Sequence, residues 1–262
     1  MSDLNIEKAK INYNAVWILA KRELLSFWRN KSRVISSLVQ GLLFLFVFGI
    51  GIGLSFNPII QGIYVDPRAF AGSGIAAMVI LFTGIFGGMA IFRDKMFGFM
   101  KELLVAPVSR RTLMLGRTVG VALQTMLQVL IIIGLSVAIG YFGNDLNLIW
   151  RVLLIIPVAF LASLGIVGIG LTISTRLRDM QSFGLIQTFI VMPMMWLSGA
   201  LIPLPIQITM YNPFTYSVDL FRFVLLGVSY FPFWLDLLIS GSFGALLILI
   251  GARSFNKMEI SQ

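Results

Sequence analysis

The chain of 262 residues contains no cysteine and no histidine, and charged residues make up only 12% of it. Without thiols there are no disulfides, thiolate metal sites or cysteine nucleophiles. Without imidazoles the commonest metal ligand and proton shuttle are missing too. We therefore expect no catalytic residues, no metal site and no cofactor held by this chain itself.

Apolar residues dominate what is present. Hydrophobic residues make up 58% of the chain, which includes 22 Phe, and the mean hydropathy is +0.94. This composition is incompatible with an ordinary soluble domain. Six apolar runs have the length of about 20 residues needed to cross about 30 Å of hydrocarbon. They cover about 34–56, 71–92, 116–141, 152–174, 182–202 and 233–251. The sequence thus predicts an all-α polytopic membrane protein with six transmembrane helices.

The basic residues gather on alternate connecting segments. The segments before 34, 93–115, 175–181 and after 251, together with Arg117, hold 17 of the 20 Lys and Arg residues. Because basic loops stay on the cytoplasmic side, we expect a multi-pass protein of the cell membrane with both termini in the cytoplasm. The net charge of +9 is then a signal of orientation, and no nucleic-acid partner is needed to explain it.

The polar N-terminal part, residues 1–33, contains an amphipathic stretch before the first span. Its apolar residues recur at helical spacing: Tyr13, Val16, Trp17, Ala20, Leu24, Phe27 and Trp28. This pattern predicts an interfacial helix that lies along the cytoplasmic membrane surface and contacts membrane lipids. A regulatory role is the alternative. Residues 34–251 form the transmembrane domain, and 252–262 form a cytosolic tail.

A charged insert separates the second and third predicted spans. Between about 94 and 106, four apolar residues share one helical face: Met96, Met100, Leu103 and Leu104. Pro107 ends this helix, and Ser109 is placed to cap a second helix that runs into the third span. We expect a short helix parallel to the membrane, with a simple interfacial loop as the alternative.

Two spans carry candidates for a substrate path. The third span has one stripe with a residue at every fourth position: Gly116, Gly120, Gln124 and Gln128. It is either a packing seam or a lining of the path. In the fifth span, Phe189, Met192 and Trp196 share a face. Their side chains suit either core packing or a lipophilic solute.

Residues 203–231 are apolar and interrupted by prolines, which predicts re-entrant half-helices that cap the outer side. Asp219 and Arg222 lie three residues apart, so we expect them to pair on one helix. Asp236, near the start of the sixth span, is expected to favour the positive end of that helix.

Three motifs then appear in order along the chain. They are KELLVAPVSRRTLMLGR from Lys101 to Arg117, SGALIPLP from Ser198 to Pro205, and YNPFTYSVDLFR from Tyr211 to Arg222. Together they resemble the permeases of ABC type-2 transporters over almost the whole chain. The resemblance implies that the insert is a coupling helix seated in a separate ATP-binding subunit. It also implies that the third motif is extracellular, with Asn212, Pro213, Asp219 and Arg222 as its marked residues.

The chain has no GxxxxGK[ST] phosphate loop, so ATP and Mg would be bound by the partner. The resemblance implies two copies of an ABC ATP-binding subunit and a second copy of this chain in a homodimer. The docking residues in the insert are then expected to be Arg93, Met96, Met100, Glu102, Leu103 and Leu104.

The function expected from the resemblance is export of a hydrophobic drug, antibiotic or lipid-like molecule, powered by the separate ATPase. Export of a polysaccharide or lipid-linked glycan is the first alternative. An ATP-independent channel or secondary carrier is an alternative of another class. A carrier driven by protons or sodium usually needs an ionisable group at mid-depth, and the predicted spans have none there.

Overall fold

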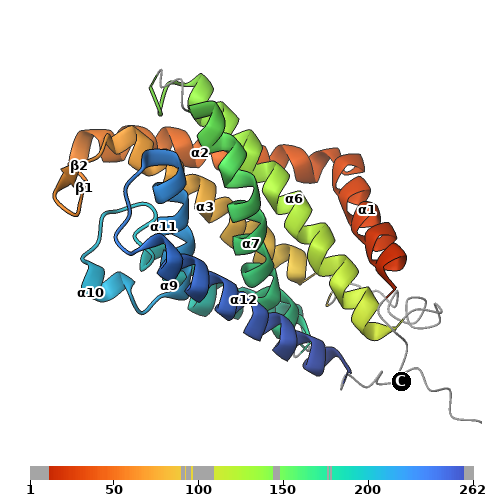
Figure 1. The fold of residues 1–262 in the computed structure, drawn as a ribbon. Helices are drawn as coiled ribbons and strands as arrows, with labels where there is room; N and C mark the ends of the chain where they lie inside the picture. Colours follow the sequence, from red (N-terminus) through yellow and green to blue (C-terminus); the bar gives the residue numbers. More distant parts are fainter. Residues whose placement is uncertain are drawn as a thin grey trace, which may run out of the picture.

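A computed structural model of the chain (Figure 1) describes residues 12–89, 92, 96, 109–143, 148–175, 177 and 179–256. Its regular structure is almost entirely helical. The helices are α1 (Tyr13–Arg29), α2 (Lys31–Ser55), α3 (Pro67–Gly88), α6 (Arg110–Ala138), α7 (Leu148–Ser174), α8 (Met180–Ile186), η2 (Gln187–Val191), α9 (Met192–Trp196), α10 (Ile206–Thr209), α11 (Pro213–Leu226) and α12 (Phe233–Asn256). By length and composition, α2, α3, α6, α7 and α12 each contain a segment able to cross a membrane.

The all-α prediction missed one small element after α2. Strands β1 (Ile59–Ile60) and β2 (Ile63–Tyr64) form an antiparallel hairpin. Gln61 and Gly62 make its turn with φ of 49° and 80°. Positive φ at both central residues matches the right-handed twist of a two-residue hairpin, and isoleucines on either side favour extended backbone.

Capping residues fix where two of the long helices begin. Asp66 accepts a hydrogen bond from the backbone N–H of Arg68, and Pro67 takes the first helical position of α3, four residues before the predicted start. Ser109 caps α6 by accepting from the backbone N–H of Thr112, as predicted. In both places a side chain accepts from an N–H that has no partner within the helix.

The prediction of one regular helix over 182–202 is wrong. The helical run ends at Trp196, and within it η2 is a π-helix. Pro193 accounts for the break in regular α-helical geometry. It has no N–H to donate, and its ring clashes with the carbonyl four residues earlier. From Met180 to Trp196 the run is 17 residues, or about 25 Å at about 1.5 Å per residue. That is shorter than about 30 Å of hydrocarbon.

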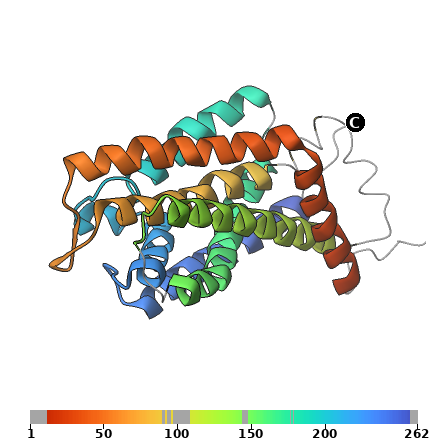
Figure 2. The same ribbon diagram turned by 90° about the horizontal axis from the view of Figure 1, so that it is seen from above.

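Helix α3 lies at the centre and contacts α2, α6, α7 and α11. It packs closely against α7, where a Cβ added at Gly88 would lie 2.6 Å from the Val167 carbonyl oxygen. A Cβ at Gly170 would in turn collide with the carbonyl of Ile85. Figure 2 shows α2 running alongside α3 on one side of the bundle.

The predicted N-terminal helix is present as α1, but much of its apolar face is covered by protein. Ala20 and Phe27 are buried, and a Cβ at Gly116 of α6 would meet the side chain of Leu19. Trp17 and Trp28 remain outside, with 60% and 52% of their surfaces exposed. The helix therefore divides its apolar residues between a contact with α6 and the surface.

We predict that Gly170→Ala lowers the melting temperature of the purified protein, because the added methyl group collides with backbone that cannot rotate away. Overpacking of this kind costs about 1–3 kcal/mol. Gly241→Ala in α12 is the matched control, since nothing lies within 4 Å of its added Cβ. Thermal unfolding in detergent checks both variants. Equal melting temperatures for the two would contradict the α3–α7 contact.

Candidate functional site

A narrow cavity lies between α2 and α3. It has a volume of about 30 Å³ and is lined by Gln40, Gly41, Phe44, Ile75, Met78, Val79, Phe82 and Thr83. A water molecule needs about 10–15 Å³ of such space, whereas pockets for drug-sized ligands have about 300–1,000 Å³. The cavity thus holds water at most in this conformation.

Five aromatic side chains run past this cavity in a continuous row, which we call the aromatic row. Its members in spatial order are Phe86, Phe82, Phe44, Phe48 and Trp196. Neighbouring ring centroids are 5.5–6.4 Å apart, within the range of favourable aromatic contacts. The row leads from the end of α3 that precedes the insert to the end of α9 that precedes the outer segment.

A polar contact adjoins the aromatic row. The Thr83 hydroxyl donates to Oε1 of Gln128 across 2.5 Å, which joins α3 to α6 beside the cavity. Gln124, one turn before Gln128, is buried. Gly116 and Gly120, earlier in the same stripe, lie against α1 and act as packing residues. The first half of this stripe therefore packs against α1, and its last residue, Gln128, contacts α3.

The three candidates of the fifth segment are placed differently. Trp196 belongs to the aromatic row through its contact with Phe48 and is 45% exposed, and Met192 packs partly buried against the core. Phe189 lies in the π-helical turn and is 72% exposed, so it makes little contact within the chain. The structure brings Trp196 to the cavity helices but leaves Phe189 on the outer surface of the bundle.

The predicted docking helix lies almost wholly outside the described residues. Arg93, Met100, Glu102, Leu103 and Leu104 are not described, and Met96 is described and half-exposed. The roles of these residues stay predictions.

The outer segment is held to α9 by its Asn-Pro motif. The Asn212 side chain donates to the carbonyl oxygen of Met194 at 2.7 Å and accepts from the N–H of Phe214 at 3.0 Å. Pro213 occupies the first position of α11, where its missing N–H costs nothing. The Asn-Pro motif thus starts α11 and also ties the start of α11 to α9.

The expected pairing of Asp219 with Arg222 is wrong, because each side chain holds a different loop. The buried Arg222 donates to the carbonyl oxygen of Gly199 at 2.6 Å, and its guanidinium lies 3.8 Å from the ring centroid of Phe70. The Asp219 carboxylate accepts from the N–H groups of Tyr230 and Phe231 at 2.8 Å. Burial raises the pKa of Asp219, against the lowering effect of these two donors and of the Arg222 charge.

Asp236 approaches Asp219 from α12. Its side chain is fully buried, and neither of its carboxyl oxygens accepts a hydrogen bond from the described residues. Asp236 lies close enough to Asp219 for the charges of the two carboxyl groups to act on each other. Two charged carboxylates buried this close to each other would repel.

The geometry defines a class of protein: a helical bundle with several segments able to span a membrane, a row of aromatic side chains between its helices and one end covered by α10 and α11. Comparison with known families then identifies it, because the model of the ABC-2 type transporter family matches residues 14–226. The chain belongs to that family and is a multi-pass membrane protein, a transport permease subunit.

Individual relatives are distant but cover most of the chain. A protein named putative transport permease ycf38 from Pyropia yezoensis is 27% identical over 230 residues, covering 81% of this chain and 74% of the relative. The protein of the same name from Porphyra purpurea is 24% identical over 215 residues, covering 79% and 72%. Nodulation protein J from Rhizobium leguminosarum bv. viciae is 25% identical over 228 residues, covering 83% of both chains.

Sequence reasoning missed most of the aromatic row. Phe44, Phe48, Phe82 and Phe86 were not among the predicted site residues. A usable signal was present, because each of the two helices carries phenylalanines four residues apart, which places them on one face. What the sequence does not show is that these two faces meet.

We predict opposite effects for the same amide substitution at the two neighbouring aspartates. Asp219→Asn can keep its oxygen toward the N–H groups of Tyr230 and Phe231, which share one carboxylate oxygen at 2.8 Å. It places an NH2 group where the other oxygen accepts from Tyr230 at 3.0 Å, and therefore lowers stability by about 1–3 kcal/mol. Asp236→Asn removes one of two neighbouring buried carboxyl groups whose charges repel each other, and is neutral or stabilising. Thermal unfolding of both variants in detergent is the measurement. A greater loss of stability for Asp236→Asn would overturn the assignment.

Proposed function

We propose that this chain is the membrane subunit of an ATP-driven exporter whose ATP is hydrolysed by a separate ATP-binding subunit. Membership of the ABC-2 type transporter family carries the proposal. The absence of a phosphate-loop motif from the sequence supports the division of labour, since the chain offers no Gly-rich loop and lysine for nucleotide phosphates. The charged insert at about 94–106 is then the coupling helix.

The proposed orientation places the insert and both termini in the cytoplasm. The distribution of Lys and Arg supports it through the positive-inside rule. Figure 1 places the start of α1, the start of α6 and the end of α12 at one end of the bundle. The N–H of Asn12 donates to the Thr112 hydroxyl at 3.4 Å, which also keeps the first two together. The hairpin and α10 lie toward the opposite end, which is the extracellular end in this proposal.

A homodimer with two ATP-binding subunits is the proposed assembly. The cavity beside the aromatic row has a volume of only about 30 Å³ within one copy, far below what a drug-sized solute requires. The outer side of α2 carries an apolar stripe at helical spacing: Ile35, Val39, Leu43, Phe46 and Ile50, all exposed. The exposed Phe189 and Trp196 extend the apolar surface over the neighbouring fifth segment. A second copy facing this surface would complete a larger path between the subunits.

The proposed cargo is a hydrophobic drug, antibiotic or lipid-like molecule. Aromatic rings offer favourable contact area to apolar and aromatic solutes, and Thr83 and Gln128 add a few hydrogen-bonding groups beside them. The cargo candidates predicted from sequence fall into two groups. Trp196 is a member of the aromatic row and Gln128 adjoins the row through Thr83. Phe189, together with the exposed part of Trp196, belongs to the surface proposed for the second copy.

We predict that Glu102→Lys combined with Leu103→Asp abolishes co-purification of the ATP-binding subunit. The first change reverses a charge and the second places a carboxylate on the apolar docking face, which carries a high desolvation cost. The matched control is Glu259→Lys with Met258→Asp in the C-terminal tail, on the same predicted side. Affinity purification from membranes, with permease levels compared, is the readout. Normal association of the insert variant would refute the coupling role.

We predict that Phe82→Leu weakens export of an amphipathic aromatic dye by raising its KM up to about tenfold, because the aromatic contact between the Phe82 ring and the dye, about 0.5–1.5 kcal/mol, is lost while apolar bulk is kept. An aliphatic amphiphile of equal size is affected less. Phe233→Leu, outside the aromatic row, is the matched control. Initial export rates are measured in inverted vesicles at equal content of assembled complex. An unchanged KM for both solutes would show that the row does not contact the cargo.

A further inference from the structure

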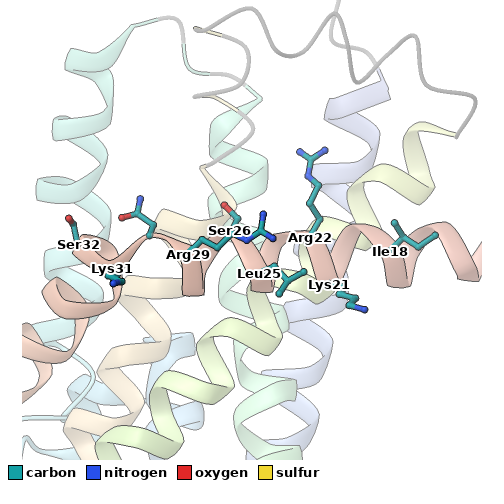
Figure 3. Close-up of a pocket in the computed structure, with 9 residues that line it drawn as sticks. Ile18, Lys21, Arg22, Leu25, Ser26, Arg29, Lys31 and Ser32 are labelled. Atoms are coloured by element: carbon teal, nitrogen blue, oxygen red, sulfur yellow. The ribbon is translucent and has the colours of Figure 1, made fainter.

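An open groove of about 1070 Å³ lies where α1 meets α2. It is lined by Ile18, Lys21, Arg22, Leu25, Ser26, Arg29, Asn30, Lys31 and Ser32. Figure 2 shows α1 turning sharply away from α2 at this junction, and Figure 3 shows the lining side chains following α1 into the first residues of α2. The groove is therefore built at an elbow between two helices.

The groove carries four positive charges, and none of them has a carboxylate partner among the described residues. The single acidic residue of α1, Glu23, is turned the other way, toward Arg117 of α6, where the two side chains lie 3.9 Å apart. Helix α2 also begins here without an acidic residue in its first turn, so the positive end of its dipole adds to the same field. These positive charges make the groove a suitable site for an anion.

The depth of the groove indicates which anion fits it. The apolar span of α2 starts at Val34, three residues after Lys31, which is a rise of about 4.5 Å along the helix. The groove thus lies at the level of the lipid headgroups. The exposed Trp17 and Trp28 lie on α1, which forms the other side of the groove. Tryptophan side chains are enriched at the level of the lipid headgroups. Ile18 and Leu25 supply apolar contact, while Ser26 and Ser32 supply hydroxyl donors to phosphate oxygens.

We propose that this groove binds the phosphate headgroup of one anionic glycerophospholipid. Helical spacing places Ile18, Arg22, Leu25 and Arg29 on one face of α1. That face differs from the one formed by Ala20 and Phe27, which are buried. The two arginines present planar donors that match phosphate oxygens, and the serines complete the polar contacts. The site shares no residue with the aromatic row or with the docking residues expected in the insert, so its test needs neither the cargo nor ATP.

The test uses the purified full-length chain and native mass spectrometry. Phosphatidylglycerol and phosphatidylcholine are offered in equal amounts, and the lipids retained after detergent exchange are counted. The wild-type chain is expected to retain phosphatidylglycerol selectively. Arg22→Gln with Arg29→Gln is expected to lower that affinity roughly 30-fold, from the contribution of each basic side chain at an anionic surface. Raising the salt concentration weakens the binding further.

Two control variants separate binding from folding. Arg22→Lys with Arg29→Lys keeps the charges and is expected to restore most of the selectivity. Arg253→Gln removes an exposed cation from the end of α12 and is expected to behave as the wild type. Equal retention of phosphatidylglycerol by the wild type and the double Gln variant would overturn the proposal.

Two further outcomes would assign the groove to something else. Displacement of phosphatidylglycerol by an equal concentration of inorganic phosphate would overturn the lipid assignment in favour of a soluble anion. Loss of the ATP-binding subunit from the double Gln variant, with lipid retention unchanged, would overturn it in favour of a subunit interface.

Discussion

The close contact of α3 with α7 is the constraint on which the rest of the bundle depends. In a bilayer, apolar helices gain little by leaving lipid, so association relies on close packing and on small residues that permit it. Gly88 and Gly170 provide that closeness, because each lies where a side chain would collide with the other helix's backbone. With α3 at the centre, Phe44 of α2 packs against Phe82 of α3. Helix α11 also contacts α3.

Sequence patterns predicted those features of the fold that depend on counting and capping. Long apolar runs gave five helices close to their observed bounds, and Ser109 marked the start of α6. The fifth span was misread because hydropathy counts apolar side chains and is insensitive to hydrogen bonds. Pro193 leaves apolarity unchanged but removes a backbone donor, which is enough to introduce η2 and to end the regular geometry. The hairpin at Gln61 was hidden because it is only a few residues long.

The candidate site was only partly predictable, for a different reason. Spacing within one helix says which residues share a face, as for Gln124 and Gln128, which are both buried. It also suggested that Asp219 and Arg222 would pair, yet both side chains reach loops that are distant in sequence. The aromatic row is a contact between helices, so no spacing within either one reveals it. Arg222 donates to the backbone carbonyl of Gly199. A pattern of side chains cannot predict such a contact, because every residue has a backbone carbonyl.

The contact of α1 with α6 has a mechanical consequence. Leu19 packs onto Gly116, and Glu23 lies beside Gly120 and faces Arg117, so the first turns of α6 and the middle of α1 form one solid body. Because α6 begins shortly after the insert, a push delivered there by the proposed ATP-binding subunit would also move α1, which the sequence predicts to lie in the headgroup layer. Each stroke would then displace lipid and do work against it. Part of the free energy of the proposed ATP-driven cycle would then be spent on moving lipid. Membrane composition would influence the rate of transport without any change at the nucleotide site of the partner.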